Sequence, residues 1–555
     1  MPTIKFSVKD LQNLVGSKLH LERIKQLLAY CKAEVGSYDK TSDEISADFA
    51  DTNLPYLWST EGISRLLKGV IGKEKGIPRV SIKNSNYDVI VDDSVSAIRP
   101  YIVAFAARGK KVDNYLIKQL IQLQEKLCES FGRRRKKVAI GIYRLNNINF
   151  PVHYKAASPE SVAFVPLDFK KAMTLAEILQ THPKGKEYGW ILNGLKRYPI
   201  LMDAENKVLS FPPIINSATS GKIDIGDSDL FFEATGTDLK SLHLAANIFA
   251  YALHDRGFEI SSVNIQYKNG TIKTPLLKTE KIKINENDVE KLLGLSLKKG
   301  DIKSLLEKAR YDVQGDSVEI PSYRGDILHR VDVIEDIGIQ HGYDKIKGIS
   351  LYEYSPGRTF EIIKFVNDAR ELMIGQGYQE IMSPILCNMD LLYSKMNLKD
   401  FGTIEIENPM SETFSCVRTW LIPLLMDVLS KNKHVDYPQK IFEEGIVTIK
   451  KGVAVVDYER IAAVAAHNNA NFTEIKQALD YLLRLFGIPY SIRETGHDSF
   501  ILGRVGRVSV NGKDIAFIGE ISPNVLRNFN MIVPVAAFEL NLTALYEAVK
   551  RFRKL

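Results

Sequence analysis

Four acidic side chains between residues 326 and 336 have the types and the spacing of a metal site. Asp332, Glu335 and Asp336 are three and four residues apart, so on a helix they share one face. Asp326 lies six residues before Asp332, where an extended segment changes to helical periodicity, and an Asp there suits the N-cap. Oxygen ligands of this kind favour a hard divalent cation such as Mg2+. The alternative from the residues alone is a capped helix with a solvated acidic face.

A resemblance to a known family favours the metal site. The stretch YRGDILHRVDVIEDIGIQHGY, residues 323–343, carries these acids and then an aromatic Gly-Tyr pair, and it resembles the B5 module of the phenylalanyl-tRNA synthetase β subunit. The resemblance implies that Mg2+ is the cofactor. It also implies which residues are the magnesium ligands: Asp326, Asp332, Glu335 and Asp336.

Three short strings earlier in the chain form a second group of polar residues with possible chemistry. They are HPKGKEY at 182–188, PPIINS at 212–217 and TGTD at 235–238. By themselves they suit turns and helix caps, because Asn, Ser, Thr and Gly favour such positions. In this order and spacing they resemble the B3/B4 editing domain of archaeal and eukaryotic-type β subunits.

That resemblance implies an editing site and the residues that line it: Leu209, Asn216, Ser217, Glu233, Thr235 and Thr237. Glu233 would accept a hydrogen bond from a tyrosine hydroxyl, while the three hydroxyl side chains would hold an ester and a water nucleophile. The chemistry has a physical reason, since a pocket built for phenylalanine rejects the isostere with one added hydroxyl only about 100-fold. A second site that hydrogen-bonds the hydroxyl reverses the preference.

The run Arg133–Lys137 is the densest positive charge of the chain and directly precedes an apolar stretch, VAIGIY, of the buried-strand type. It suits a phosphate contact. It equally suits a solvated loop edge beside a strand, and the sequence leaves both interpretations open.

The last two hundred or so residues alternate helical and mostly antiparallel strand patterns and resemble a class II synthetase core in its β-subunit form. A working core of that class needs an Arg-x-Glu and a glycine-rich motif ending in Arg. Here the corresponding strands read Lys440-Ile-Phe-Glu-Glu444 and Pro534–Leu540, without those arginines, and Gly503–Arg507 lies too early. Because such chemistry relies on charge stabilisation, we expect no catalytic residues for aminoacylation. Ser220-Gly221-Lys222 does not complete a P-loop either.

The composition is that of a globular protein with several domains. The chain has 555 residues, a formal net charge of +7 and four cysteines without a CxxC pair, which argues against a disulfide framework or a zinc site. The first residues lack the apolar core of a signal peptide, and no apolar run is long enough to span a membrane. We therefore expect a cytoplasmic protein with no membrane association.

Together these patterns predict an α+β multidomain fold. The expected domains are a B1-like domain at 1–90, a B3/B4 editing domain at 91–268, a small helical B5 module with the magnesium site at 269–346, and a class II-like antiparallel core at 347–555 that is catalytically silent and serves subunit assembly.

The function that this resemblance implies is that of a phenylalanyl-tRNA synthetase β subunit. Its expected partners are an α subunit in an α2β2 tetramer and tRNA(Phe), with ATP and L-phenylalanine bound through the α subunit. The β chain itself would hydrolyse mischarged Tyr-tRNA(Phe). Two alternatives stay open: a non-enzymatic scaffold and tRNA-binding subunit whose editing site has decayed, and a free-standing deacylase.

Overall fold

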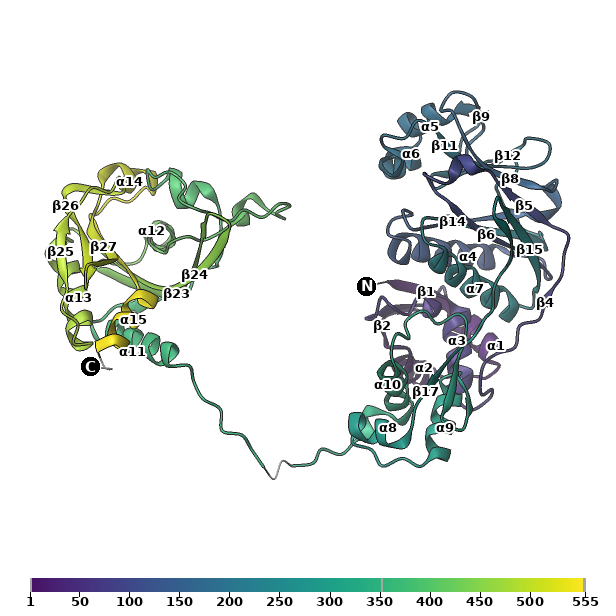
Figure 1. Ribbon diagram of the computed structural model, residues 1–555, viewed down its shortest axis with the longest axis horizontal. Helices are drawn as coiled ribbons and strands as arrows, with labels where there is room; N and C mark the ends of the chain where they lie inside the picture. The colour runs from purple at the N-terminus through teal and green to yellow at the C-terminus, as the bar shows by residue number, and fades with distance from the viewer. Residues whose placement is uncertain (1, 351–352, 553–555) are drawn as a thin grey trace. The chain divides into compact units, whose positions relative to one another are not determined.

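The structure is a computed structural model that describes residues 2–350 and 353–552. The chain divides into two compact units, residues 1–349 and 350–555 (Figure 1). Within the described residues, every helix is too short or too polar to span a lipid bilayer. Each unit is described by itself.

The chain begins with a small antiparallel sheet covered by three helices. Its strands, in the order β1-β3-β2, are β1 (Thr3–Ser7), β2 (Ala33–Asp39) and β3 (Glu44–Phe49). The helices are α1 (Val8–Val15), α2 (Leu21–Leu28) and α3 (Thr60–Val70). Ser59 caps α3 by accepting a hydrogen bond from the Gly62 amide, as the Ser-Thr-Glu-Gly sequence suggests. Gly69 of α3 lies so close to the Lys308 carbonyl that a Cβ there would overlap it, so α3 and the later segment pack backbone to backbone.

A large mixed sheet follows, with the strand order β13-β12-β11-β8-β5-β15-β6-β14-β7 and with β4 and β16 paired to β15. Its strands are β4 (Ile82–Lys83), β5 (Asp88–Val91), β6 (Tyr101–Arg108), β7 (Val138–Arg144), β8 (Val152–Ala157), β11 (Tyr198–Met202), β12 (Val208–Phe211), β13 (Ile215–Asn216), β14 (Asp229–Gly236), β15 (Glu259–Tyr267) and β16 (Gly270–Thr274). Between β8 and β11 in the chain, β9 (Ala163–Phe164) and β10 (Met173–Thr174) form a separate two-stranded sheet.

This sheet curls on itself. One buried cluster joins Val89 of β5, Tyr154 of β8 and Leu209 of β12 to Tyr143 of β7 and Phe231 of β14. These strands come from both ends of the strand order, so the two ends of the sheet face each other across a shared apolar core. The upper and lower layers of strands are visible in Figure 1.

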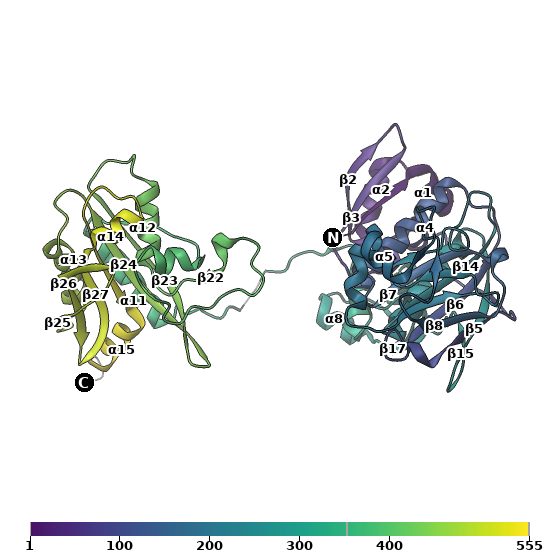
Figure 2. The ribbon, with the colours of Figure 1, turned by 90° about the horizontal axis from the view of Figure 1, so that it is seen from above.

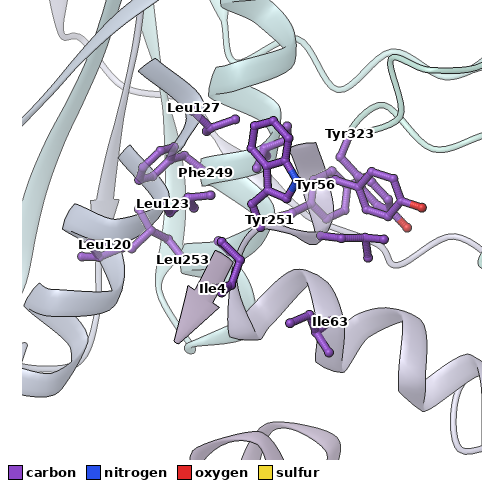
Figure 3. Close-up of a cluster of buried hydrophobic side chains, with 14 of the residues drawn as sticks. Ile4, Tyr56, Ile63, Leu120, Leu123, Leu127, Phe249, Tyr251, Leu253 and Tyr323 are labelled. Atoms are coloured by element: carbon purple, nitrogen blue, oxygen red, sulfur yellow. The ribbon is translucent and has the colours of Figure 1, made fainter. Parts of the chain in front are cut away.

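Four helices pack against this sheet. They are α4 (Asn114–Lys126), which continues as a short π-helix (Leu127–Phe131), α5 (Leu175–Thr181), α6 (Pro183–Tyr188) and α7 (Leu239–Asp255). Two of them, α4 and α7, link the sheet to the first domain. Figure 3 shows Ile4, Ile63, Leu123, Phe249 and Tyr323 in one cluster, so the first sheet, α3, α4, α7 and the loop after β19 (Ser317–Ile320) share a core. Thr174 and Glu177 form a capping box at the start of α5, as the Thr-x-x-Glu sequence suggests, and the helix ends before His182.

A compact module closes the first unit. It has a three-stranded sheet in the order β17-β19-β18 and three helices. They are β17 (Glu280–Lys283), β18 (Asp312–Gln314), β19, α8 (Glu286–Leu293), α9 (Lys299–Lys308) and α10 (Arg330–His341). The predicted N-cap at Asp326 is wrong. Helix α10 begins later, with His329 as its N-cap, because Asp332 reaches back to accept the amide hydrogens of Leu328 and His329.

The second unit is a sheet with helices on both faces. Its order is β20-β23-β24-β28-β27-β26-β25, and only β20 and β23 are parallel, so the predicted, mostly antiparallel sheet is confirmed. The strands are β20 (Gln379–Glu380), β23 (Gln439–Lys451), β24 (Ala454–Ala466), β25 (Ser491–Glu494), β26 (Phe500–Val510), β27 (Lys513–Ile521) and β28 (Val535–Asn541), with a separate pair, β21 (Leu386–Cys387) and β22 (Cys416–Val417). The helices are α11 (Glu361–Gly375), α12 (Ile422–Lys431), α13 (Phe472–Leu485), α14 (Pro523–Asn528) and α15 (Leu542–Phe552); Figure 2 shows this unit from a second direction.

Alternation along β24 explains the two helical layers of this unit. Ile461 and Ala463 pack with α11, α13 and α15, whereas Ala462 and Val464 pack with α12 and α14. Successive side chains of a strand point to opposite faces, and here both faces are apolar.

Two of the predicted domain boundaries differ from the sheet limits. Strands β4 and β5 already belong to the large sheet, which therefore begins near residue 82 rather than 91. Strand β16 extends the same sheet to Thr274, beyond the predicted end at 268. Both differences arise because β15 pairs with short edge strands that carry little apolar alternation of their own.

Candidate functional site: a cavity at the curled end of the large sheet

A cavity of about 470 Å3 lies where the two ends of the large sheet meet. One wall is α4, with Ile117 and Leu120, and another is the strand β7 with Ala139. The segment after β12 closes the far side. A volume of this size fits a small ligand or an amino-acid side chain with its ester.

Strand β14 places Glu233 and Thr235 in the cavity. The two residues are separated by one position and so point to the same face of the sheet. Opposite Glu233 stand Ala104 of β6 and Gly141 of β7. These neighbours are small, which leaves room for the carboxyl group: a Cβ at Gly141 would overlap the hydroxyl of Tyr143 and the Oε1 atom of Glu233.

Glu233 is a buried carboxyl with one oxygen unused. Its side chain is 3% exposed, and its Oε1 atom accepts a hydrogen bond of 2.7 Å from the Tyr143 hydroxyl. Its Oε2 atom has no partner among the described residues. Burial raises the pKa of Glu233 to about 7, although the Tyr143 hydrogen bond and the Arg99 charge both oppose the shift. Near neutral pH the group is therefore poised between acid and carboxylate.

Arg99 is a buried cation that donates hydrogen bonds to Thr235 of the same strand. It is 2% exposed, its Nε donates to the Thr235 hydroxyl over 3.0 Å, and its Nη1 donates to the Lys136 carbonyl over 3.0 Å. These hydrogen bonds hold the guanidinium, and burial lowers its pKa. Thr235 is thereby oriented by a cation that the sequence analysis did not single out.

The PPIINS segment forms the rim on the opposite side. The Asn216 side chain lines the cavity and donates to the Gly221 carbonyl over 3.0 Å. Arg135 holds the same segment by donating from Nη1 to the carbonyls of Pro213 and Ile214, at 3.3 and 2.9 Å. The guanidinium also lies 4.1 Å from the Tyr188 ring centroid, so two of the three sequence strings meet at Arg135.

Three of the six residues predicted for the editing site line this cavity: Asn216, Glu233 and Thr235. The other three do not. Leu209 of β12 points into the apolar core of the sheet. Ser217 is 1% exposed, and its hydroxyl is hydrogen-bonded to the hydroxyl of Thr219. Thr237 is exposed and follows the end of β14. The sequence interpretation missed other residues that contribute to the site: Arg99, Arg135, Tyr143, Asp168 and Lys184. Two of them lie in stretches that the sequence analysis had singled out: Arg135 in the basic run 133–137 and Lys184 in HPKGKEY at 182–188.

The four carboxylates predicted as magnesium ligands all have partners within the protein. Asp326 and Asp336 both bind the Arg324 guanidinium, at 2.5 and 2.9 Å, and Asp336 also accepts from the Tyr311 hydroxyl. Asp332 accepts the two amide hydrogens at the start of α10. Glu335 pairs with Lys32 of the first domain at 2.7 Å.

These oxygen donors are of the type that Mg2+ prefers, but the residues as placed do not fit the ion. Residues 2–350 and 353–552 contain no group of three or more His, Cys, Asp or Glu side chains arranged to hold a metal. Two of the four carboxylates, Asp326 and Asp336, instead share an ion pair with the Arg324 cation. Magnesium binding therefore stays a prediction.

The second unit has a cavity of about 380 Å3 on its sheet. The two arginines that line it are neutralised: Arg460 pairs with Glu539 at 2.8 Å, and Arg507 lies 3.3 Å from Asp514. Each guanidinium thus already has a carboxylate partner.

Comparison with known proteins places these features in a family. The chain is 40% identical over 555 residues to the phenylalanine–tRNA ligase beta subunit of Pyrococcus horikoshii, covering 98% of this chain and 100% of that protein. The Pyrococcus abyssi protein of the same name is 41% identical, covering 99% and 100%. The chain belongs to the phenylalanine–tRNA ligase beta subunit family.

Domain matches and a solved structure agree with this assignment. Residues 282–343 match the tRNA synthetase B5 domain, and residues 352–542 match the phenylalanyl tRNA synthetase beta chain CLM domain. The crystal structure of an N-terminal fragment of the Pyrococcus horikoshii phenylalanyl-tRNA synthetase beta subunit is similar to this chain, with a TM-score of 0.60 and 40% identity. It covers 62% of this chain and all of that fragment.

Replacing Arg324 by Gln should lower the free energy of unfolding of the first unit by about 3 kcal/mol, because two partly buried carboxylates would lose their shared cation. Denaturant unfolding of the full chain measures this in a Trp420→Phe background, where Trp58 and Trp190 report on that unit. We expect millimolar Mg2+ to stabilise R324Q more than the parent, and Arg324→Lys to lie between them. Strong Mg2+ stabilisation of the parent that disappears in Asp332→Ala would contradict the placement of the carboxylates described above.

Glu233 should make the stability of the first unit depend on pH. Its folded pKa of about 7 lies above the ordinary value of 4.5 for a glutamate, so the folded state binds the proton more tightly than the unfolded state. The resulting stabilisation is complete below pH 4.5 and is lost as the pH rises through 7. The isosteric, neutral Glu233→Gln should remove about 3 kcal/mol of this pH dependence, measured by unfolding parent and variant at several pH values. Parallel pH profiles for the two proteins would contradict the raised pKa.

Proposed function

We propose that this chain is the beta subunit of a phenylalanine–tRNA ligase and that its cavity hydrolyses tyrosine wrongly attached to tRNA(Phe). The observation that carries the proposal is the unpaired Oε2 atom of Glu233 in a cavity of the right size. Tyr143 occupies Oε1, so Oε2 is the acceptor that remains for a phenolic hydroxyl.

Discrimination in this cavity follows from the cost of an unpaired polar group. A tyrosyl ester would satisfy Oε2, whereas a phenylalanyl ester would leave a buried carboxyl without its partner. The apolar walls from α4, with Ile117 and Leu120, accept either ring. The preference for tyrosine would thus come from one hydrogen bond.

The hydrolytic step would use water rather than a side-chain nucleophile. The cavity lining contains no Cys or His among the described residues. Asn216 and Thr235 are among the neutral polar groups of the lining, with Ser210 and Gln124, and they could orient the ester and a water. The second unit, whose arginines are paired, would serve assembly with an alpha subunit that binds ATP and L-phenylalanine.

The second unit exposes apolar side chains suited to such a partner. Met382 and Met410 are almost fully exposed, and Ile385, Phe414 and Ile446 are exposed as well. Exposed apolar side chains of this number are typical of a surface that another subunit covers. A free-standing deacylase would have no use for them.

Changing Glu233 to Ala in the assembled enzyme should reduce deacylation of Tyr-tRNA(Phe) about 10- to 100-fold, the effect of losing a hydrogen bond to a charged group worth about 1.5–3 kcal/mol. Charging with phenylalanine should stay within about twofold of the parent, because Glu233 lies outside the second unit. Both rates are measured with purified tRNA(Phe). Equal deacylation by variant and parent would mean that the acid is structural, and no deacylation by the parent would favour a scaffold subunit.

The purified chain without an alpha subunit should form no phenylalanyl-adenylate. Its sheet lacks the motif arginines, and the two arginines of its cavity are paired with carboxylates. Phenylalanine-dependent exchange of pyrophosphate into ATP is the assay. Exchange above background, which survives removal of contaminating synthetase, would overturn the proposal that this core is silent.

A further inference from the structure

The turn at residues 133–137, called here the basic turn, lies beside the mouth of the cavity and is built in an unusual way. Arg133, Arg134 and Arg135 all have positive φ, at 51°, 51° and 64°. Side chains with a Cβ rarely adopt this region, and three in succession are rarer still. The turn is fixed by backbone hydrogen bonds, among them Arg134 to Glu129, Arg135 to Cys128 and Lys137 to Gly132.

Gly132 shows how tightly the turn closes. A Cβ at this position would come within 2.5 Å of both the Cys128 and the Val138 carbonyl oxygens. The amide hydrogens of the basic turn are therefore occupied, and only its side chains are available to a ligand. Unfavourable backbone of this kind persists where the surrounding structure enforces it, often beside functional sites.

The left-handed backbone divides the cations of the turn into two groups. Arg135 points inward, holds the Pro213 and Ile214 carbonyls and lines the cavity. Arg133, Arg134 and Lys136 point outward and are exposed. One residue thus builds the cavity wall while its neighbours present positive charge at the rim.

The outward cations have no acidic partners. Lys137 pairs with Asp238 at 3.0 Å, and Arg135 lies 4.0 Å from Glu129. Among residues 2–350 and 353–552, Arg133, Arg134 and Lys136 form no ion pair. Adjacent unpaired cations are mutually repulsive, and an anionic partner would relieve that repulsion.

An exposed aromatic ring accompanies these cations. The Arg134 guanidinium lies 5.9 Å from the ring centroid of Trp190, whose side chain is 41% exposed. Trp190 follows Tyr188, on which Arg135 is stacked. An exposed indole beside unpaired cations is the combination with which proteins bind single-stranded nucleic acid, since bases stack on the ring and phosphates contact the cations.

We infer that Arg133, Arg134, Lys136 and Trp190 form a clamp for the single-stranded 3′ end of a tRNA, which it guides into the cavity. The inference rests on the proposed editing function and deepens it by naming how the substrate's nucleic-acid part is held. Phosphates bind the outward cations, one unpaired base stacks on Trp190, and the esterified amino acid reaches past Arg135 to Glu233.

The test uses the assembled enzyme and a pair of matched charge variants. Arg133→Gly/Arg134→Gly removes two cations, and glycine accepts the positive φ without strain. Lys110→Ala/Lys111→Ala removes two exposed cations of the same domain that do not line the cavity. We expect kcat/KM for Tyr-tRNA(Phe) to fall about tenfold in the first variant and to change less than about twofold in the second. Arg133→Lys/Arg134→Lys should stay close to the parent.

A small substrate without phosphate distinguishes an effect on the clamp from an effect on the cavity. Hydrolysis of 2′(3′)-O-tyrosyl-adenosine, which has the ester but no phosphate, should be unchanged in the glycine variant. An equal loss with this substrate would mean that the cavity itself was damaged and would overturn the inference. An unchanged kcat/KM for Tyr-tRNA(Phe) would overturn it as well, while the proposed editing function would stand.

If the parent hydrolyses neither substrate, the proposed editing function fails. A binding measurement still tests the clamp in that case. The probe is a fluorescent hexanucleotide with a 3′-terminal CCA. The slope of log affinity against log salt should become shallower by about 1.4 in the glycine variant, about 0.7 for each lost phosphate contact. Trp190→Ala should weaken binding about 5- to 100-fold at every salt concentration, and Trp190→Phe should restore most of it. Identical slopes for parent and glycine variant would refute the clamp.

Discussion

A carboxyl group buried in the middle of a sheet is the constraint on which the candidate site depends. Glu233 can be accommodated in β14 only because its neighbours across the strands are Ala104 and Gly141. Burial raises the pKa of Glu233 to about 7, and the Tyr143 hydroxyl and the Arg99 charge oppose that rise. The result is a group near its pKa at neutral pH with one oxygen free, which is the property that an editing site for tyrosine requires.

The same strand joins this carboxyl to the charged rim. Arg99 binds Thr235 of β14 and also the carbonyl of Lys136 in the basic turn. Arg135 then links the turn to the segment on the opposite side of the cavity. The buried Arg99 and the partly buried Arg135 thus fix the cavity walls through hydrogen bonds to carbonyls. The exposed cations of the basic turn are the ones that we propose bind the tRNA.

The acidic helix α10 illustrates how carboxylates with the spacing of a metal site can pair with protein cations instead. Arg324 pairs with both Asp326 and Asp336 and is stacked 5.0 Å from the Tyr56 ring centroid, and Glu335 reaches Lys32 in the first domain. Glu335 therefore joins this module to the first domain of the chain. Their spacing is compatible with both roles, since side chains on one helix face can converge on an ion or diverge to separate partners.

The sequence by itself determined the local features: the capping box at Thr174, the N-cap at Ser59, the alternation of the class II-like strands, and the family, through strings that are contiguous. Three residues that it predicted for the editing site, Asn216, Glu233 and Thr235, line one cavity. The sequence could not place Tyr143, Arg99 or Arg135, because each contacts residues about 80 to 140 positions away, and no periodicity encodes that distance. Nor could it exclude Leu209, Ser217 and Thr237, whose burial or exposure depends on how the sheet curls. Tertiary structure decided which polar groups share a cavity and which acids find a cation, since both depend on packing between segments remote in sequence.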